Sequence, residues 1–357
     1  MMNIKEIRTK IISVPFLDPP KTSFLPLQTI DLLIVEIETT EGFIGTGHLH
    51  PIAGGLLTIE MCINEMLKPL LIGETIKNIE YLWLKMWKST FIQGRMGITV
   101  MAMSAIDIAL WDCLGRTLNQ PLWKIWNGNN SPLPTYGSGC WRGLGHDGMI
   151  EKAEKYVKQG FKSIKMQVSH CFTNDEDIAN VRDMREALKD EIGIMIDVNQ
   201  GWEIDEAIKV GLAIEKYNPE WLEEPIMADD FEGYDKICDL ISIPVVTGEN
   251  NFTHHDFKHF FKSKKIKILQ PDIMRGGYTN LMLTSKLADA SNMKIAPHLF
   301  PELSIHLLAS IKNPSWLEYM GWFDHLWIEP IIPINGMMTP PNRPGHGMDF
   351  KPEILAR

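Results

Sequence analysis

The sequence predicts an α/β protein in which a closed barrel of parallel strands follows a smaller α+β domain. Its 357 residues exceed what one ordinary hydrophobic core fills. Beyond about residue 130, short runs rich in β-branched residues alternate with helical patterns, as expected of strands joined by helical crossovers. Eight candidate strands and seven helical patterns fall in roughly 190 residues, which is near the size of a βα barrel.

The first part of the chain has a different sequence pattern. Residues 4–15 and 32–39 are rich in β-branched side chains, and residues 42–48 follow a turn at Glu41-Gly42, which predicts a small antiparallel sheet. We therefore expect an α+β capping domain over residues 1–125. Its helical patterns lie at residues 57–67, 79–86 and 100–114.

The barrel is predicted over residues 126–325, and the proline- and glycine-rich segment 326–357 is expected to pack back on the capping domain. An open doubly wound sheet is the alternative, but it usually carries a GxGxxG loop after its first strand. Gly137, Gly139 and Gly143 do not have that spacing, which favours the barrel. The candidate strands are residues 133–138, 161–167, 192–199, 220–224, 243–249, 266–272, 294–298 and 316–318, and the helical patterns include 174–188, 204–217, 253–263 and 279–291.

Composition limits the function classes. Lys plus Arg number 35 against 45 Asp plus Glu, a net charge of -10, which argues against a nucleic-acid partner. The five cysteines are scattered without a CxxC pair, as expected of free thiols in a cytoplasmic protein. The longest apolar stretch, residues 98–111, contains Ser104 and Asp107 and is expected to fall short of a membrane span. We expect a soluble cytoplasmic protein with no membrane partner.

Three carboxylates end successive candidate strands at equal intervals. Asp197, Glu223 and Glu249 are 26 residues apart (197 to 223 and 223 to 249), about the length of one βα unit, so they should share one rim of the barrel. Converging like charges cost several kcal/mol unless a cation neutralises them, and an all-oxygen cluster suits Mg²⁺. Each acid alone is more simply a helix cap or a surface residue. The equal spacing favours a metal site, to which Asn199 could add a contact.

The next two strands end in an acid and an imidazole. Asp272 and His298 would lie close together on neighbouring strands, where the carboxylate fixes the tautomer and raises the basicity of the ring. Facing a metal, such a pair indicates an acid–base dyad. Glu318 ends the last strand and should point into the same mouth, where crowding by other carboxylates is expected to keep it protonated.

On the second strand Lys165 and Gln167 are two residues apart, so both should face the barrel interior. A buried lysine needs an anion, and a substrate carboxylate would serve; the alternative is a lysine that reaches solvent at the strand tip. Ser138, on the first strand, is a further candidate for binding that carboxylate, although small polar residues are common at strand ends.

At these residues the sequence resembles the enolase superfamily, specifically its mandelate racemase-like branch. The resemblance runs over nearly the whole chain, from AIDIALWDCLGRTLNQPLWKIWNG through IDVNQGW, WLEEPI, TGEN, QPDIMRGG, PHLFPELSIHLLAS and SWLEY to PGHGM. It implies a (β/α)7β modified TIM barrel, a homo-oligomer, and a capping domain whose segments 16–25 and 48–55 close on the substrate. It also implies roles for the site residues: Asp197, Glu223 and Glu249 as Mg²⁺ ligands, Asp272 and His298 as the acid–base dyad, and Glu318, Lys165 and Ser138 at the substrate carboxylate.

One departure from the family pattern bears on the reaction. The branch often carries Lys-x-Lys on the second strand, whereas this chain has Lys165-Met166-Gln167. A glutamine cannot take up a proton, so one of the two bases needed for racemisation is missing. A single dyad suffices for dehydration, and we expect a Mg²⁺-dependent sugar-acid dehydratase whose substrate-binding residues include Ser138, Gln167 and Asn199. The alternatives are a racemase or epimerase of an α-hydroxy acid and a non-catalytic metal-binding relative.

Overall fold

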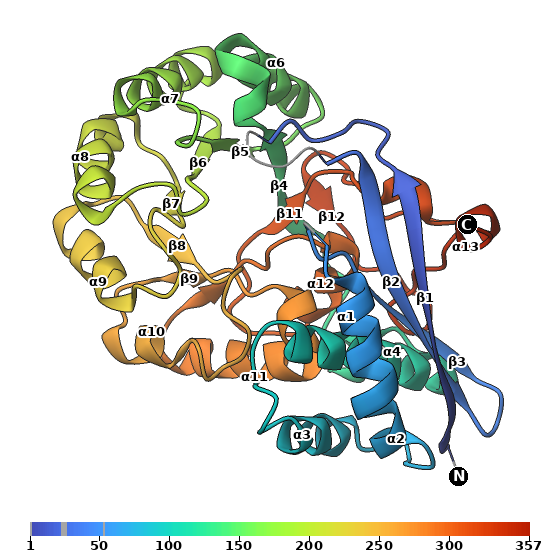
Figure 1. The fold of residues 1–357 in the computed structure, drawn as a ribbon. Helices are drawn as coiled ribbons and strands as arrows, with labels where there is room; N and C mark the ends of the chain where they lie inside the picture. Colours follow the sequence, from blue (N-terminus) through green and yellow to red (C-terminus); the bar gives the residue numbers. More distant parts are fainter. Residues whose placement is uncertain (1, 23–26, 53) are drawn as a thin grey trace.

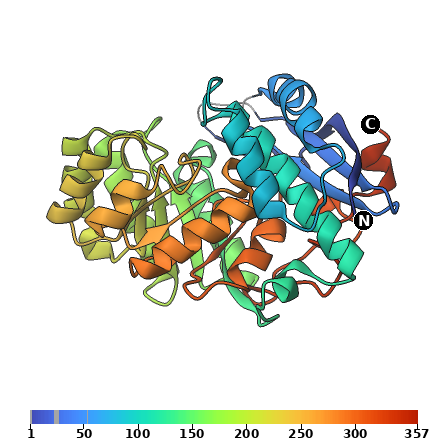
Figure 2. The ribbon, with the colours of Figure 1, turned by 90° about the horizontal axis from the view of Figure 1, so that it is seen from below.

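The structure is a computed structural model that describes residues 2–22, 27–52 and 54–357. Figure 1 shows two parts, a ring of strands and helices from green to orange and a blue N-terminal cap beside it. Figure 2, seen from below, shows the same two parts side by side, with the red C-terminal segment lying against the cap.

The ring is a closed parallel barrel. Its strands are hydrogen-bonded in chain order from β4 to β10, and β11 returns to pair with β4. A parallel bridge between Ile295 and Pro314, just before β11, joins the two ends of the series, so the predicted barrel is confirmed over the open sheet. The strands are β4 (Leu133–Cys140), β5 (Ser163–Gln167), β6 (Gly193–Asp197), β7 (Trp221–Glu223), β8 (Val245–Thr247), β9 (Ile268–Leu269), β10 (Lys294–Ile295) and β11 (Leu317–Tyr319).

Seven helices connect these strands within residues 133–319, all of which the structure describes, which confirms the (β/α)7β pattern. Helix α7 has the predicted bounds, and a capping box of Thr173 and Glu176 fixes where it begins. Helix α10 begins five residues later than predicted (258 against 253), because the Asp256 carboxylate accepts the amide hydrogens of Phe252 and Thr253 and holds a turn there. The helices are α6 (Gly145–Lys158), α7 (Asn174–Leu188), α8 (Ile204–Ile214), α9 (Phe231–Leu240), α10 (Lys258–Ser263), α11 (Gly277–Ala290) and α12 (Pro301–Leu308).

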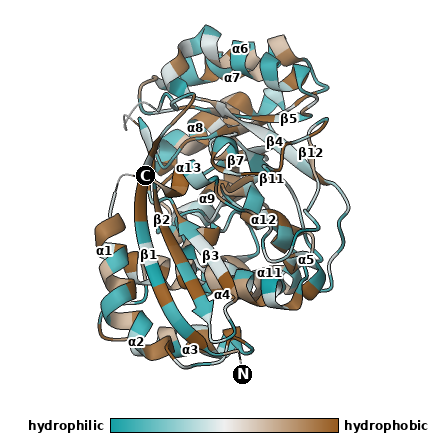
Figure 3. Cartoon of the chain, turned by 90° about the vertical axis from the view of Figure 1, so that its right-hand side faces the viewer, coloured by the Kyte–Doolittle hydropathy of each residue, from teal (hydrophilic) through white to brown (hydrophobic). Residues whose placement is uncertain are grey.

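The cap is an antiparallel sheet covered by helices, as predicted. Strand β2 (Thr29–Thr39) pairs with both β1 (Ile4–Pro15) and β3 (Ile44–Leu49). Hydrophilic and hydrophobic bands alternate along β1 in Figure 3, as expected where one face of a strand is buried. The predicted helix 57–67 is interrupted by a π-helical turn. The helical segments are α1 (Leu56–Met61), the π turn Cys62–Leu67, α2 (Lys68–Leu71), α3 (Ile79–Ser89), α4 (Ile98–Leu118) and α5 (Leu122–Ile125).

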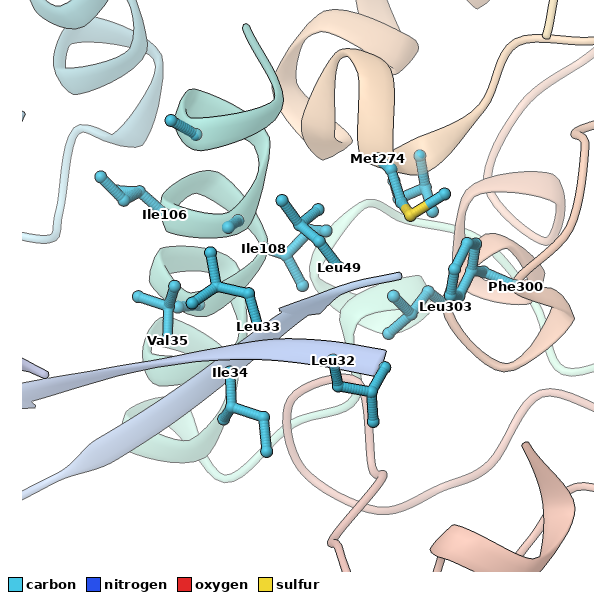
Figure 4. Packing of buried hydrophobic residues seen from close by; sticks show 14 of the residues in the cluster. Leu32, Leu33, Ile34, Val35, Leu49, Ile106, Ile108, Met274, Phe300 and Leu303 are labelled. Atoms are coloured by element: carbon cyan, nitrogen blue, oxygen red, sulfur yellow. The ribbon is translucent and has the colours of Figure 1, made fainter. Parts of the chain in front are cut away.

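Helix α4 lies directly on the sheet. Figure 4 shows Leu33 and Val35 pointing towards α4 while their neighbours in β2 point to the opposite face. Strand β3 and helix α4 are very close together. A Cβ on Gly45 would lie 2.3 Å from the Cys113 nitrogen, and a Cβ on Gly47 would lie 2.3 Å from the Ala105 oxygen. These glycines therefore serve packing rather than phosphate binding.

Gly47→Ala is expected to lower the free energy of unfolding by about 2–3 kcal/mol, because the added methyl group forces α4 away from β3. Urea unfolding followed by circular dichroism measures this change. Ile44→Ala, at a 41 % exposed position on the same strand, is the matched control and should change the value by less than about 0.5 kcal/mol. A Gly47→Ala protein as stable as the parent would contradict the packing account.

Helix α4 also corrects one expectation from the sequence. Its 21 residues are long and apolar enough to cross a membrane by length and composition, but 78 % of its most apolar window is buried inside the protein. The two polar residues do not end the helix, because Ser104 donates to the Val100 carbonyl oxygen and the Asp107 carboxylate accepts the backbone N–H and hydroxyl of Thr279. The helix therefore belongs to the core between the cap and the barrel.

The C-terminal segment returns to both parts of the molecule. Strand β12 (Met337–Met338) pairs with β4, and α13 (Pro352–Leu355) lies beside β1 (Figure 1). There Lys10 Nζ donates to the Leu355 carbonyl oxygen. The division of the chain at residues 125 and 325 stays a prediction. All five cysteines lie in the described ranges and are free thiols, of which three are buried.

Candidate active site

A cavity of about 460 Å³ lies at the carboxyl ends of the barrel strands, where the cap covers them. Segments 16–25 and 48–55 of the cap were expected to close here, and Thr22, Pro51 and Ile52 do line the cavity, whereas residues 23–25 and 53 lie outside the described residues. Seven of the ten predicted site residues line the cavity: Lys165, Gln167, Asp197, Asn199, Glu249, Asp272 and His298.

The predicted acid and imidazole form a hydrogen-bonded pair. His298 Nδ1 lies 2.8 Å from Asp272 Oδ2, and the other carboxylate oxygen of Asp272 accepts the Met274 amide hydrogen at 2.7 Å. His298 Nε2 lies 3.3 Å from Glu249 Oε2. Burial lowers the pKa of His298, but the charge of Glu249 and the hydrogen bond that Nδ1 donates to Asp272 outweigh it and raise the pKa to about 10. The dyad is thus assembled, with Nε2 directed to the carboxylates of the cavity.

Lys165 neutralises a cluster of buried carboxylates. Its Nζ lies 2.5 Å from Glu223 Oε1, 2.8 Å from Glu318 Oε1 and 3.6 Å from Asp197 Oδ2. The lysine is 3 % exposed, so the alternative in which it reaches solvent is wrong. Burial opposes its charge, but the surrounding carboxylates hold its pKa above the ordinary value. Lys165 is therefore a charged group fixed at the floor of the cavity.

The expectation that Glu318 stays protonated is wrong. Burial raises the pKa of Glu318, but the charges of Lys165 and His298 outweigh it and lower the pKa to about 2. Its Oε2 also accepts the Leu299 amide hydrogen at 2.9 Å. The neighbouring acids favour protonation, but the two cations Lys165 and His298 decide the charge of this carboxylate.

The two adjacent glutamates of WLEEP take different positions. Glu223 turns into the barrel, where it accepts hydrogen bonds from Trp221 Nε1 at 3.0 Å and Gln270 Nε2 at 2.7 Å. Glu224 lines the cavity and accepts from the Gln200 and Asn250 side chains at 3.0 and 2.8 Å. Its φ of 38° breaks the strand alternation, so the Glu224 side chain reaches the cavity, which Glu223 does not line. Glu224 was not among the predicted site residues, although it is the second acid of the WLEEP motif.

The carboxylates suit a hard divalent cation by their chemistry. Among the residues that the structure describes, no three His, Cys, Asp or Glu side chains are arranged to hold a metal ion, and Lys165 Nζ is paired with Glu223. Burial and the charge of Asp197 nevertheless raise the pKa of Glu249, and burial and the charge of Glu249 raise that of Glu224. Buried oxygens that repel one another fit a cation such as Mg²⁺.

Asn199 connects the candidate metal ligand to its surroundings. Its Nδ2 donates to Asp197 Oδ2 at 3.0 Å, while its Oδ1 accepts from Gln167 Nε2 at 3.0 Å and Arg142 Nη2 at 2.7 Å. The amide therefore fixes the orientation of the Asp197 carboxylate. Ser138, in contrast, lies outside the main cavity and lines a smaller one of about 70 Å³; β4 is irregular after Ser138, so alternation does not carry its side chain to the site.

Sequence reasoning missed the wall of the cavity that faces the cap. Trp141 and Trp322 stack with ring centroids 5.6 Å apart, and apolar side chains including Leu27, Ile52 and Met101 continue this surface. These residues follow strand ends or come from the cap, so no local spacing marks them. His170 also lines the cavity and follows Gln167 by three residues.

Both halves of the chain match known families. Residues 6–126 match the mandelate racemase / muconate lactonizing enzyme N-terminal domain, and residues 148–354 match the enolase C-terminal domain-like family. The chain therefore belongs to the mandelate racemase/muconate lactonizing enzyme family of the enolase superfamily, which confirms the resemblance stated from the sequence.

Individual relatives agree over almost the full length. The chain is 31 % identical to 3,6-anhydro-alpha-L-galactonate cycloisomerase of Streptomyces coelicolor, over 99 % of both chains. It is similar to the crystal structure of a racemase from Streptomyces coelicolor with bound magnesium (TM-score 0.94, 30 % identity, 99 % of both chains). It is also similar to that of L-talarate dehydratase from Polaromonas sp. JS666 with Mg and L-glucarate (TM-score 0.91, 29 % identity, 100 % of this chain and 97 % of that one). The expected cofactor, Mg²⁺, agrees with these magnesium-bound structures.

Proposed function

We propose that this protein is a Mg²⁺-dependent dehydratase of a sugar acid. The observation that carries the proposal is the His298–Asp272 pair, 2.8 Å apart, on the wall of a carboxylate-rich cavity that also contains Lys165. A base beside charged groups that can stabilise an anion is what removal of a proton α to a carboxylate requires. The similarity to L-talarate dehydratase supports the same reaction class.

In the proposed reaction His298 Nε2 takes the proton from the α-carbon while Asp272 holds Nδ1. The electron pair moves into the carboxylate to give an enediolate, and Lys165 stabilises its negative charge. When bound, Mg²⁺ would hold the substrate carboxylate and offset this charge further. Together these electrostatic effects must supply on the order of 10 kcal/mol of barrier reduction. Because Glu249 is the first among the groups that raise the pKa of His298, neutralising Glu249 lowers that pKa and favours the basic form of the imidazole.

Asp197, Glu223 and Glu249 are the proposed metal ligands, and paired variants test the choice between adjacent glutamates. Glu223→Gln is expected to weaken Mg²⁺ binding by about tenfold or more, because it removes a charge from the ligand set. Glu224→Gln, the matched control, should have a smaller effect, since Glu224 is held by neutral amide donors. Isothermal titration with MgCl₂ measures both affinities. A larger loss of Mg²⁺ affinity in Glu224→Gln than in Glu223→Gln would identify Glu224 as the ligand instead.

The substrate assay is a screen of a sugar-acid library for 2-keto-3-deoxy products with and without Mg²⁺. A product that forms only with the metal supports the proposal. No product from any acid, with Mg²⁺ shown to bind, would overturn it.

A cycloisomerase is the second candidate, favoured by the 31 % identity to the Streptomyces coelicolor cycloisomerase over 99 % of both chains. It could begin with the same proton abstraction by His298. Mass spectrometry separates the two reactions, because isomerisation conserves the mass of the substrate and dehydration removes one water.

The proposal also covers the binding partner, the location and the oligomeric state of the protein. We propose that the partner is a small-molecule carboxylate, with neither nucleic acid nor a membrane involved, and that the protein is a cytoplasmic homo-oligomer. The net charge of -10 supports the absence of a nucleic-acid surface. Light scattering coupled to size-exclusion chromatography measures the oligomeric state.

A further inference from the structure

We propose that His170 is a second catalytic residue of this site, the general acid that protonates the oxygen leaving the β-carbon. The inference rests on the proposed dehydration. It assigns to His170 a proton transfer that the amide side chain of Gln167 cannot perform. It is carried by the position of His170 in the cavity, by the contacts that hold its ring, and by the chemistry of the side chains around it.

His170 and His298 enter the cavity from different sides of the barrel. Both line the cavity, and among the described residues that do so they are the two with imidazole side chains. His170 follows β5, whereas His298 follows β10, and the strand order places two strands between them on one side and four on the other. A substrate between the two rings would therefore present its α-hydrogen and its leaving group to different histidines.

The ring of His170 is held in place by the neighbouring loop. Its Nε2 lies 3.0 Å from the carbonyl oxygen of Asn199, an acceptor, so Nε2 carries a hydrogen and Nδ1 is the nitrogen that exchanges a proton. The backbone is fixed as well, because Ser169 and His170 both have positive φ (70° and 59°) and the Ser169 amide donates to Asp177 Oδ1 at 2.8 Å.

Gly201 has no side chain, which leaves room for the loop that carries Ser169 and His170. A Cβ at Gly201 would lie 2.3 Å from Ser169 Oγ and 2.9 Å from His170 Nε2. The loops after β5 and β6 therefore fit together only with a glycine at this point, and a side chain there would displace the ring.

The other groups on the same side cannot supply the proton. Gln167 has an amide side chain, which does not ionise, and its Nε2 already donates to Asn199 Oδ1. Lys165 is bound by carboxylates, which hold its pKa high and its proton firmly. An imidazole, in contrast, can both donate and take up a proton.

The proposed dehydration removes a proton from the α-carbon and then water from the β-carbon. The Cα–H bond breaks and its proton goes to His298, while the electron pair forms the enediolate. That pair then forms the Cα=Cβ bond as the Cβ–O bond breaks, and the leaving oxygen takes a proton from the His170 imidazolium and departs as water. The enol product becomes the 2-keto-3-deoxy acid by proton return at Cβ, and His170 regains its proton from solvent.

The test uses the acid found in the library screen, with Mg²⁺, in deuterated water. His170→Gln is expected to lower the dehydration rate by about 100-fold or more. The recovered substrate should gain deuterium at its α-carbon, because an enediolate that cannot expel its leaving group is reprotonated. Retained exchange also shows that the His298 dyad is intact in the variant. Gly201→Ala, which displaces the His170 ring, should also lower the dehydration rate while exchange persists. Cys171→Ser, at the exposed neighbouring residue, is the control and should dehydrate the acid at the parental rate.

A 3-deoxy-3-fluoro analogue of the same acid completes the test, because fluoride leaves without a proton. His170→Gln should eliminate fluoride within about threefold of the parent rate, since no general acid is needed. Parental dehydration by His170→Gln, loss of exchange together with dehydration, or an equal slowing of fluoride loss would each overturn the role of His170. These outcomes leave the proposed function standing, whereas a parent protein that forms no product from any acid removes the function itself.

Discussion

His298→Asn is expected to lower kcat/KM for dehydration by about 10³-fold and to abolish exchange of the substrate α-hydrogen with solvent. Asparagine can keep a hydrogen bond to Asp272, which lies 2.8 Å from the ring, but it cannot take up a proton. Steady-state kinetics and α-deuterium incorporation by NMR measure the two effects. The joint loss distinguishes this variant from His170→Gln, in which exchange should persist.

Asp272→Asn provides the companion measurement. It leaves the imidazole in place and removes the charge that orients it, so an intermediate loss of about 10²-fold is expected. Exchange at the parental rate in His298→Asn would show that another residue is the base and would remove His298 from the mechanism.

Lys165→Met is expected to lower the free energy of unfolding by about 3–5 kcal/mol at pH 7, besides abolishing activity. The ammonium group contacts Glu223 and Glu318 at 2.5 and 2.8 Å, and its removal leaves buried charges without a partner. Urea unfolding measures the difference. Lys162→Met, at an exposed position just before β5, is the control and should change the value little.

The pH dependence of stability should change in the same variant. In the parent the pKa of Glu318 is lowered to about 2, so its contribution to stability is full above its ordinary pKa of 4.5 and is lost as the pH falls towards 2. Without the lysine charge the buried carboxylate becomes easier to protonate. The stability deficit of Lys165→Met should therefore shrink as the pH is lowered from 7 to 5. Equal stability of the variant and the parent at pH 7 would contradict this account of the cluster.

The sequence predicted the barrel and most of its mouth because both depend on regular spacing. One βα unit of constant length places Asp197, Glu223 and Glu249 on successive strands, and the same repeat brings Asp272 beside His298. Strand lengths were less predictable: β9 comprises two residues where seven were expected (266–272), because the chain leaves the strand ladder before Asp272. Asp197 and Glu223 still end their strands as expected, whereas Asp272 and His298 lie past theirs and are joined by an isolated parallel bridge.

Contacts between distant parts of the chain could not be read from spacing. The ion pair of Lys165 with Glu318 ties the second strand to the last one and reverses the expected protonation state of the glutamate. The stacked pair Trp141 and Trp322 forms only when β4 and β11 meet at barrel closure. The burial of helix α4 also depends on a distant part of the chain, since the Asp107 carboxylate accepts hydrogen bonds from Thr279 of the barrel helix α11.

A crystal structure of the His298→Asn variant with Mg²⁺ and the acid that the parent dehydrates tests the central claim most directly. We predict one magnesium ion bound by Asp197, Glu223 and Glu249, with the substrate carboxylate completing its coordination and the α-carbon facing residue 298. A metal ion held elsewhere, or one whose coordination is filled by the protein with no room for the acid, would contradict the account.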